Sequence, residues 1–235
     1  MVKELSNTET LRNDFISNVS HEITAPRSAG EGCATLLQHE QLSKEEQATY
    51  ISRILENTSR LSKLTQSILS LSKLENQEIV LQQESFMLDE QIRRVLLSYE
   101  PLWEEKELNI DLALEATQIY GSKSLLAQVW SNLIDNAIKF SRPGGTLFIS
   151  CGVFDGRIVV RIRDTGVGMS EEVRKHAFDK FYQGERSHSG QGSGLGLALV
   201  QRIVSLSGGS VDLQSREGKG TEITVSLKNE QEMPA

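Results

Sequence analysis

The chain divides into two regions that differ in the spacing of their apolar and polar residues. Over residues 11–37 and again over 45–74, apolar residues recur at the spacing of an α-helix, and the second stretch carries a broad apolar stripe. Ser43 and Glu46 form a capping-box pattern that would start the second helix. The pattern predicts a helical hairpin with a short connection near residues 40–43.

The apolar stripes of this hairpin also predict an oligomer. Two long amphipathic helices cannot enclose their own apolar faces, and pairing with a second copy would bury them in a four-helix bundle. We therefore expect a homodimer. The first helix should be weak just beyond Pro26, because Gly30 and Gly32 each cost about 1 kcal/mol relative to alanine inside a helix.

Beyond the hairpin, assigned to residues 1–76, the pattern changes. A polar stretch at 77–85 reads as a linker, residues 86–229 mix helices and strands, and 230–235 form a tail. The predicted fold is α+β, a bundle-forming hairpin followed by a layered α/β domain. The elements expected in the second region are helices at 89–106 and 124–140, strands at 108–114, 210–215 and 222–227, two short helices, and a β-hairpin of 146–154 and 157–163 joined by Asp155-Gly156.

Composition narrows the function classes. The 235 residues are 38% hydrophobic, which is ample for two modest domains, and the net charge of −7 with a pI near 5.3 argues against nucleic-acid partners. Cys33 and Cys151 lack metal or disulfide spacing. No apolar run approaches the roughly 20 residues that span a bilayer, and no signal-peptide pattern opens the chain. A cytoplasmic location is therefore expected.

The helix predicted at 124–140 carries a candidate phosphate and metal site. Asn132 and Asn136 stand four residues apart and project from one face, with Lys139 one turn further on. Amide oxygens suit Mg²⁺, and a nearby lysine can neutralise phosphate charge. Asparagine is also common on ordinary helices, so this pair alone decides nothing.

Two glycine-rich segments follow. Asp164-Thr165-Gly166-Val167-Gly168 comes directly after a strand, where a carboxylate can accept from an exocyclic amine and glycines let backbone approach a flat ring, although a tight turn has the same composition. The segment 190–196 has four glycines and then opens a helix, whose free amides and dipole favour an anion. A flexible linker is the alternative, and the abrupt amphipathic helix argues against it.

In order and spacing these segments, with Gly218-Lys219-Gly220-Thr221, resemble the N, G1, G2 and G3 boxes of sensor histidine kinases. Residues 132–140 are similar to the N box, and 178–182 resemble the F box that precedes the ATP lid. The resemblance covers about residues 11–227 and implies an ATP-binding domain of the histidine kinase, gyrase and chaperone ATPase type. The residues that it assigns to ATP are Asn132, Asn136, Lys139, Phe140, Asp164, Gly166, Gly168, Gly192, Gly194, Leu195, Gly196 and Thr221, with Asn136 as the Mg²⁺ ligand and Asp164 reading the adenine amine.

Ser20-His21-Glu22 followed by Pro26 is similar to the H box of the same family. His21 lies roughly 160° around the helix from the apolar face, so it points outward, as would an ordinary surface histidine. The resemblance makes His21 the phospho-acceptor, and Glu22 could take the proton of one ring nitrogen. The match then departs from the family, because Ala25 replaces a Thr or Asn that holds water for dephosphorylation and Arg27 replaces an apolar core residue.

The resemblance implies ATP-dependent autophosphorylation of His21 and transfer to an aspartate of a response regulator. Phosphatase activity is expected to be impaired by Ala25. The alternative is a nucleotide-binding signalling dimer or scaffold with an impaired H box, while a plain ATPase is disfavoured because Asn132 stands where that class has a catalytic glutamate. A longer protein anchored in a membrane through an upstream segment is compatible with this stretch being its cytoplasmic portion.

Overall fold

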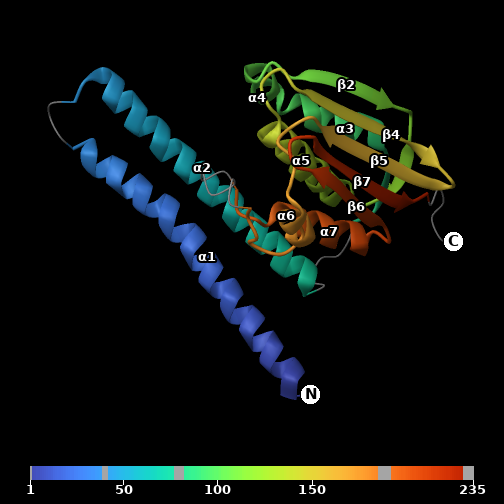
Figure 1. Cartoon of the computed structure of the whole chain (residues 1–235), viewed down its shortest axis with the longest axis horizontal. Helices are drawn as coiled ribbons and strands as arrows, with labels where there is room; N and C mark the ends of the chain where they lie inside the picture. Colours follow the sequence, from blue (N-terminus) through green and yellow to red (C-terminus); the bar gives the residue numbers. More distant parts are fainter. Residues whose placement is uncertain (1, 39–41, 77–81, 185–191, 230–235) are drawn as a thin grey trace.

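The computed structural model describes residues 2–38, 42–76, 82–184 and 192–229, with side chains from residue 16 onward. A long helical hairpin projects from a layered α/β domain (Figure 1). Helices α1 (Val2–Leu36) and α2 (Lys44–Glu75) lie side by side along the hairpin. Helix α2 agrees closely with the predicted stretch of 45–74, whereas α1 begins nine residues before the predicted stretch of 11–37. Part of the connection predicted near 40–43 lies outside the described residues.

Local sequence explains how the hairpin begins and continues. The Glu46 amide donates to Ser43 Oγ at 3.2 Å and the Ser43 amide donates to the Glu46 carboxylate at 2.9 Å, so the predicted capping box is present. Helix α1 runs through Pro26, which is buried, and through both glycines to Leu36. The helix is therefore continuous across both glycines, and its weakness beyond Pro26 stays a prediction.

The second domain holds a five-stranded sheet in the order β2-β4-β5-β7-β6, in which only the β2–β4 pair is parallel. A two-stranded antiparallel sheet, β1 with β3, lies apart from it. The elements are β1 (Glu84–Met87), α3 (Leu88–Leu97), α4 (Glu100–Glu105), β2 (Asn109–Leu114), β3 (Gln118–Gly121), α5 (Lys123–Phe140), β4 (Thr146–Phe154), β5 (Arg157–Asp164), α6 (Glu171–His176), α7 (Gly196–Leu206), β6 (Ser210–Arg216) and β7 (Gly220–Lys228).

Three details differ from the sequence expectation. Strand β1 begins inside the predicted linker, at Glu84, and β3 was not foreseen, because both strands are only four residues long. The single helix expected at 89–106 is two helices, which separate at Ser98 and Tyr99 just before Pro101. The hairpin turn is as predicted, since Asp155 and Gly156 have φ of 49° and 73°, the left-handed values that a tight two-residue turn needs.

The core of this domain lies between the large sheet and a layer of helices that includes α5 and α7 (Figure 1). Trp130 and Ile134 on α5 and Ile149 on β4 are fully buried there. Burying such side chains stabilises a fold by about 1.5–3 kcal/mol each. Helix α7 also contacts α2, so the helix layer joins the two domains.

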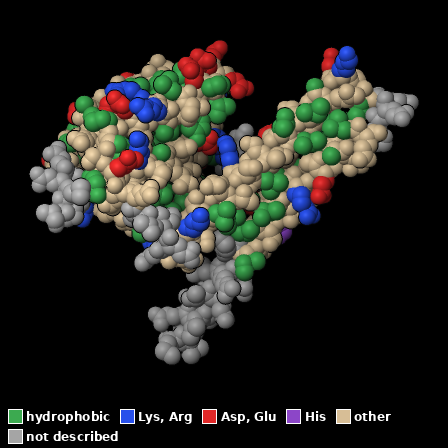
Figure 2. Space-filling view, turned by 180° about the vertical axis from the view of Figure 1, so that it is seen from behind, with side chains coloured by type: hydrophobic (Ala, Val, Ile, Leu, Met, Phe, Trp, Pro, Cys, Tyr) green, Lys and Arg blue, Asp and Glu red, His purple; other side chains and the backbone are tan. Residues whose placement is uncertain are grey.

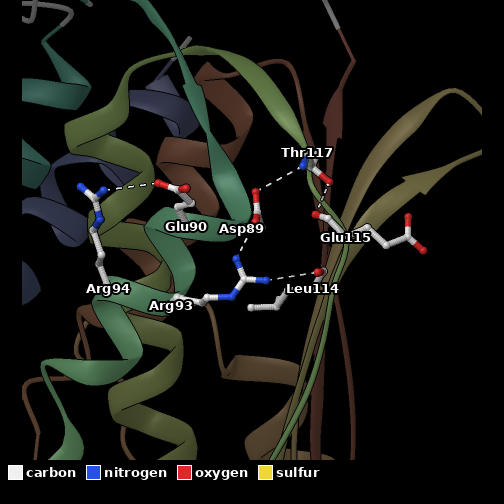
Figure 3. A network of polar contacts seen from close by, with 7 residues as sticks. All are labelled: Asp89, Glu90, Arg93, Arg94, Leu114, Glu115 and Thr117. Atoms are coloured by element: carbon white, nitrogen blue, oxygen red, sulfur yellow. Dashed lines mark hydrogen bonds and ion pairs between the residues drawn. The ribbon is translucent and has the colours of Figure 1, made fainter.

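A buried polar network fixes α3 against the segment between β2 and β3 (Figure 3). Asp89, 5% exposed, accepts from the Arg93 guanidinium at 2.6 Å and from the Thr117 amide at 3.3 Å, while Arg93 also donates to the Leu114 carbonyl at 3.3 Å. Burial alone would raise the pKa of Asp89, but these hydrogen bonds and the Arg93 charge outweigh it and hold the pKa below its ordinary value. The carboxylate is therefore a stable anchor for α3.

The hairpin exposes apolar side chains that the α/β domain does not cover, and Figure 2 shows them distributed along its length. On α2, Leu55 is 65% and Leu69 is 56% exposed. Within the described residues no helix is long and apolar enough to cross a membrane. The other large apolar side chains exposed on the hairpin are Ile16, Leu36 and Ile51.

Candidate functional site

The middle of α5 meets the first residue of α7. The Asn132 side-chain amide donates to the Gln128 carbonyl at 2.9 Å, and its Oδ1 faces Gly196, where an added Cβ would lie only 3.2 Å away. Asn132 and Asn136 are both partly exposed. The glycine at the start of α7 therefore lets the helix N-terminus approach the face that carries both asparagines.

Lys139 lies at the C-terminal end of α5, next to the second glycine-rich segment. Its Nζ would be 2.9 Å from a Cβ added at Gly192, and it lies 4.4 Å from the centroid of the Phe140 ring. Burial lowers the pKa of Lys139, with Asp135 opposing and the positive charges of Arg60 and Lys106 adding to the lowering. An anion at this point would be stabilised by a partly desolvated cation.

Asp164 ends β5 at the floor of the same region. Its side chain is 5% exposed, and its Oδ1 accepts from the Gly166 amide at 2.8 Å. Burial raises the pKa of this carboxyl, although backbone hydrogen bonds from Gly166 and Thr221 partly oppose that shift. Thr221 faces Asp164 in the β5–β7 pair, so the segments 164–168 and 218–221 meet across two neighbouring strands.

The glycines after Asp164 are required by close backbone contacts. An added Cβ at Gly166 would lie 2.1 Å from the Phe140 carbonyl oxygen, and the Val167 amide donates to that same oxygen at 3.1 Å. Gly168 has φ of 64° and approaches the Arg216 carbonyl equally closely. This turn therefore packs directly on the end of the helix that carries the asparagines, which a simple solvent-exposed turn would not do.

The second glycine segment turns sharply before α7. Gly194 has φ of 66°, and its carbonyl accepts from the Phe181 amide at 2.9 Å. Leu195 is fully buried and caps the helix that starts at Gly196. Gly190 and Gln191 of the predicted segment lie outside the described residues. The structure thus joins several of the predicted ATP-site segments by direct contacts, which pair Asn132 with Gly196, Lys139 with Gly192, the Phe140 carbonyl with Gly166, and Asp164 with Thr221.

His21 is exposed on α1, as the helical spacing predicts. The neighbouring Glu22 accepts from Arg60 on α2 at 3.2 Å through one carboxylate oxygen and from Gln183 at 3.3 Å through the other. Among the hydrogen bonds of the described residues, none joins Glu22 to the His21 ring. The proposed proton acceptor therefore faces the α/β domain.

The two residues that depart from the H-box pattern are both exposed. Arg27 pairs with Glu31 at 3.6 Å on the surface of α1, and Ala25 presents its methyl group to solvent. Within one chain Arg27 therefore disturbs no core. Its effect on a bundle of two hairpins stays a prediction.

Leu71 belongs to the apolar stripe that the spacing predicts on the second helix, but the contacts that join the two domains were not foreseen from the sequence. Leu71 and Leu74 on α2 are 2% and 1% exposed and belong to the same apolar cluster as the α/β core. Arg202 on α7 donates to the Leu74 carbonyl at 2.9 Å, and Lys180 pairs with Glu75. No motif marks these positions, because their roles depend on how the domains dock.

Two known protein families match this chain, one over the hairpin and one over the α/β domain. Residues 11–77 match the His Kinase A (phospho-acceptor) domain, and 121–231 match the histidine kinase-, DNA gyrase B- and HSP90-like ATPase family. The heme sensor protein HssS of Staphylococcus saprophyticus is 32% identical over 224 residues, which are 95% of this chain and 48% of that protein. The chain thus spans about half the length of this relative.

Solved structures agree in fold. The histidine kinase AdeS of Acinetobacter baumannii superimposes with a TM-score of 0.74 at 26% identity, covering 90% of this chain and 98% of AdeS. The histidine kinase ThkA in complex with the response regulator TrrA gives 0.78 at 23% identity, covering 96% of this chain and 64% of that one, which shows the fold. Two family models in this order, together with these relatives, place the chain in the sensor histidine kinase family, as a catalytic core with a phospho-acceptor hairpin and an ATP-binding domain.

Proposed function

We propose that this core transfers the γ-phosphate of ATP to His21 and then passes the phosphate to an aspartate of a response regulator. The observation that carries the proposal is the hydrogen bond from Gln183 to Glu22, which brings the H-box helix to the edge of the candidate ATP site. Membership in the family supports two-component signalling in general. Phosphorylation of His21 and transfer of the phosphate to the regulator are the two steps that we propose.

The candidate site has the groups that ATP requires. Asp164 offers a buried carboxylate acceptor for the adenine amine, and the glycine at 166 lets the turn after Asp164 pack on the end of α5. The start of α7 offers free amides to phosphate, and Lys139 adds a positive charge at the same end of α5. The amide oxygen of Asn136 fits Mg²⁺, which would neutralise charge on the phosphates, and Asn132 would face the phosphates beside Lys139.

The first chemical step forms a bond between an imidazole nitrogen of His21 and the γ-phosphorus, and breaks the bond from that phosphorus to the β–γ bridging oxygen, so that ADP leaves. The other ring nitrogen gives up its proton to Glu22, which lies next in sequence. Most of the catalysis would come from positioning and charge neutralisation, because phosphoryl transfer needs little covalent help from protein. Each carboxylate oxygen of Glu22 has a second lone pair beside the one that its present partner uses, so Glu22 would accept the ring proton while Arg60 and Gln183 stay bound.

A homodimer and a receiver partner complete the proposal. The exposed leucines and isoleucines of the hairpin supply the apolar surface that a four-helix bundle buries. ThkA, which shares this fold, binds a response regulator. We propose the same class of partner here.

Incubation of the purified chain with radiolabelled ATP tests the proposal. Phosphohistidine is labile to acid and survives alkali, so label that behaves in this way supports histidine as the acceptor. Label that survives acid would place the phosphate on a hydroxyl side chain and contradict the proposal. Nucleotide binding without any label would favour the alternative of a signalling dimer or scaffold.

We further propose that the core is a poor phosphatase toward its phosphorylated regulator. Hydrolysis of an aspartyl phosphate needs a water held in line, and the methyl group of Ala25 cannot hydrogen-bond it. Ala25→Thr in a His21→Gln background should raise the rate of phosphate loss from a purified phospho-regulator by roughly 10². Equal rates with and without the hydroxyl would contradict this role of position 25.

A further inference from the structure

The side-chain amide of Gln183 contacts both helix α1 and the second glycine-rich segment. Its Nε2 donates to the Gly192 carbonyl at 3.0 Å and to the Glu22 carboxylate at 3.3 Å. Gly192 in turn lies against the Lys139 ammonium, since an added Cβ there would be 2.9 Å from Nζ. A continuous set of contacts therefore runs from the phosphate-facing end of α5 to the residue beside His21.

Glu22 is held from two sides at once. Arg60 of α2 binds one carboxylate oxygen at 3.2 Å and Gln183 of the α/β domain binds the other at 3.3 Å. The side chains of Arg60 and Glu22 are 31% and 23% exposed, so solvent screens this pair less than an open surface ion pair. With both oxygens bound, the carboxylate and the helical turn that carries it have a defined orientation.

We propose that Gln183 is a positioning residue for phosphoryl transfer, which sets the acceptor helix against the nucleotide site through Glu22. This inference rests on the proposed autophosphorylation of His21. Gln183 touches no reacting atom in the structure, so it acts through Glu22, and Arg60 keeps Glu22 in reach of it. The side-chain amide suits this task because it donates to a carboxylate and a carbonyl together.

The test compares Gln183→Ala with Gln118→Ala in the intact dimer. Gln118 is an exposed glutamine on β3 of the same domain and serves as the matched control. Phosphohistidine formation is followed in a single turnover at saturating ATP, and affinity for a fluorescent ATP analogue is measured separately. Loss of one hydrogen bond to a charged group predicts a labelling rate about ten- to a hundredfold lower for Gln183→Ala, with affinity changed less than about twofold.

A merely structural role for Gln183, bracing Gly192, would lower nucleotide affinity and leave the rate at saturating ATP nearly unchanged, and that result would overturn the inference. An unchanged rate would overturn it as well. If the unmodified chain formed no phosphohistidine, both the proposed function and this inference would fail. If the unmodified chain formed phosphohistidine and Gln183→Ala formed it at the same rate, only this inference would fail.

A charge swap gives a readout other than activity. Gln183→Glu places two carboxylates together, so amide hydrogen exchange of the α1 turn around Glu22 should accelerate beyond that in Gln183→Ala. Combining it with Glu22→Gln restores one donor and one acceptor and should return the protection. Protection that responds to neither variant would show that the contact does not hold the helix, and would overturn the proposal.

Discussion

The α/β domain and the hairpin use their apolar residues in opposite ways. Trp130 and Ile149 are fully buried in the core of the α/β domain, while the hairpin buries Leu64, Leu71 and Leu74 in the same apolar cluster, which both domains share. Large apolar side chains elsewhere on the hairpin remain exposed, as on Leu55. The difference shows that one domain carries its core within itself, whereas the other is completed by surfaces outside it.

The two domains also differ in how much space surrounds their glycines. In the α/β domain Gly166 fills a gap with no space for a methyl group, because an added Cβ would lie 2.1 Å from the Phe140 carbonyl oxygen. On α1, Gly30 and Gly32 have nothing within 4 Å of that position. One substitution should therefore have opposite effects in the two regions.

Gly166→Ala should produce the largest effect. The new methyl would displace backbone at the end of α5, so we expect a loss of about 3 kcal/mol in the free energy of unfolding and weaker nucleotide binding. Urea denaturation followed by circular dichroism measures the first and titration with a nucleotide analogue the second. Gly121→Ala is the control, because its Cβ would meet only Leu126 at 3.7 Å. Equal stability of both variants would contradict the close contact.

Leu55→Glu tests the hairpin surface and should have the next largest effect. We propose that this face is buried between two copies, so a charge on it should shift the dimer toward monomer and raise the dimer dissociation constant at least about tenfold. Light scattering over a concentration series measures it. Leu102, 46% exposed on α4, provides the matched Leu→Glu control in the other domain. An unchanged dimer in Leu55→Glu, or dissociation in the control, would move the interface away from this face.

Gly32→Ala should give the smallest change, and a favourable one. Alanine in an open helical position is expected to add about 1 kcal/mol to stability, which corresponds to about 2–4 °C in melting temperature for a chain of this size. Gly156→Ala offers the contrast, because that position is equally open but has φ of 73° and should be destabilised. A lower melting temperature for Gly32→Ala would indicate that the partner hairpin packs against this glycine.

Sequence patterns predicted the parts of the fold that depend on local chemistry. The capping box at Ser43 and the Asp155-Gly156 turn follow from short-range rules, and both are present. The helix expected at 89–106 is interrupted because Pro101 has no N–H to donate to the Leu97 carbonyl, and its ring would clash with that carbonyl in a continuous helix. The sequence contained this signal. Strands β1 and β3 are too short to show a period of two.

The candidate site could be assembled from motifs, but its connection to the acceptor helix could not. Asn132, Lys139 and Asp164 stand in segments with recognisable spacing, and the structure brings these segments together. Arg60 and Gln183 lie 38 and 161 positions from Glu22 in sequence, and only the docking of two domains makes them its neighbours. Contacts of this kind depend on tertiary arrangement, which no local pattern encodes.

The most direct test of the account compares phosphate incorporation and nucleotide affinity in His21→Gln and the unmodified chain. Because the proposed acceptor lies on the hairpin and the proposed nucleotide residues lie on the α/β domain, the variant should incorporate no phosphate and bind an ATP analogue with unchanged affinity. Label retained by His21→Gln would move the acceptor to another residue. Loss of both label and nucleotide affinity would contradict the division of roles between the two domains.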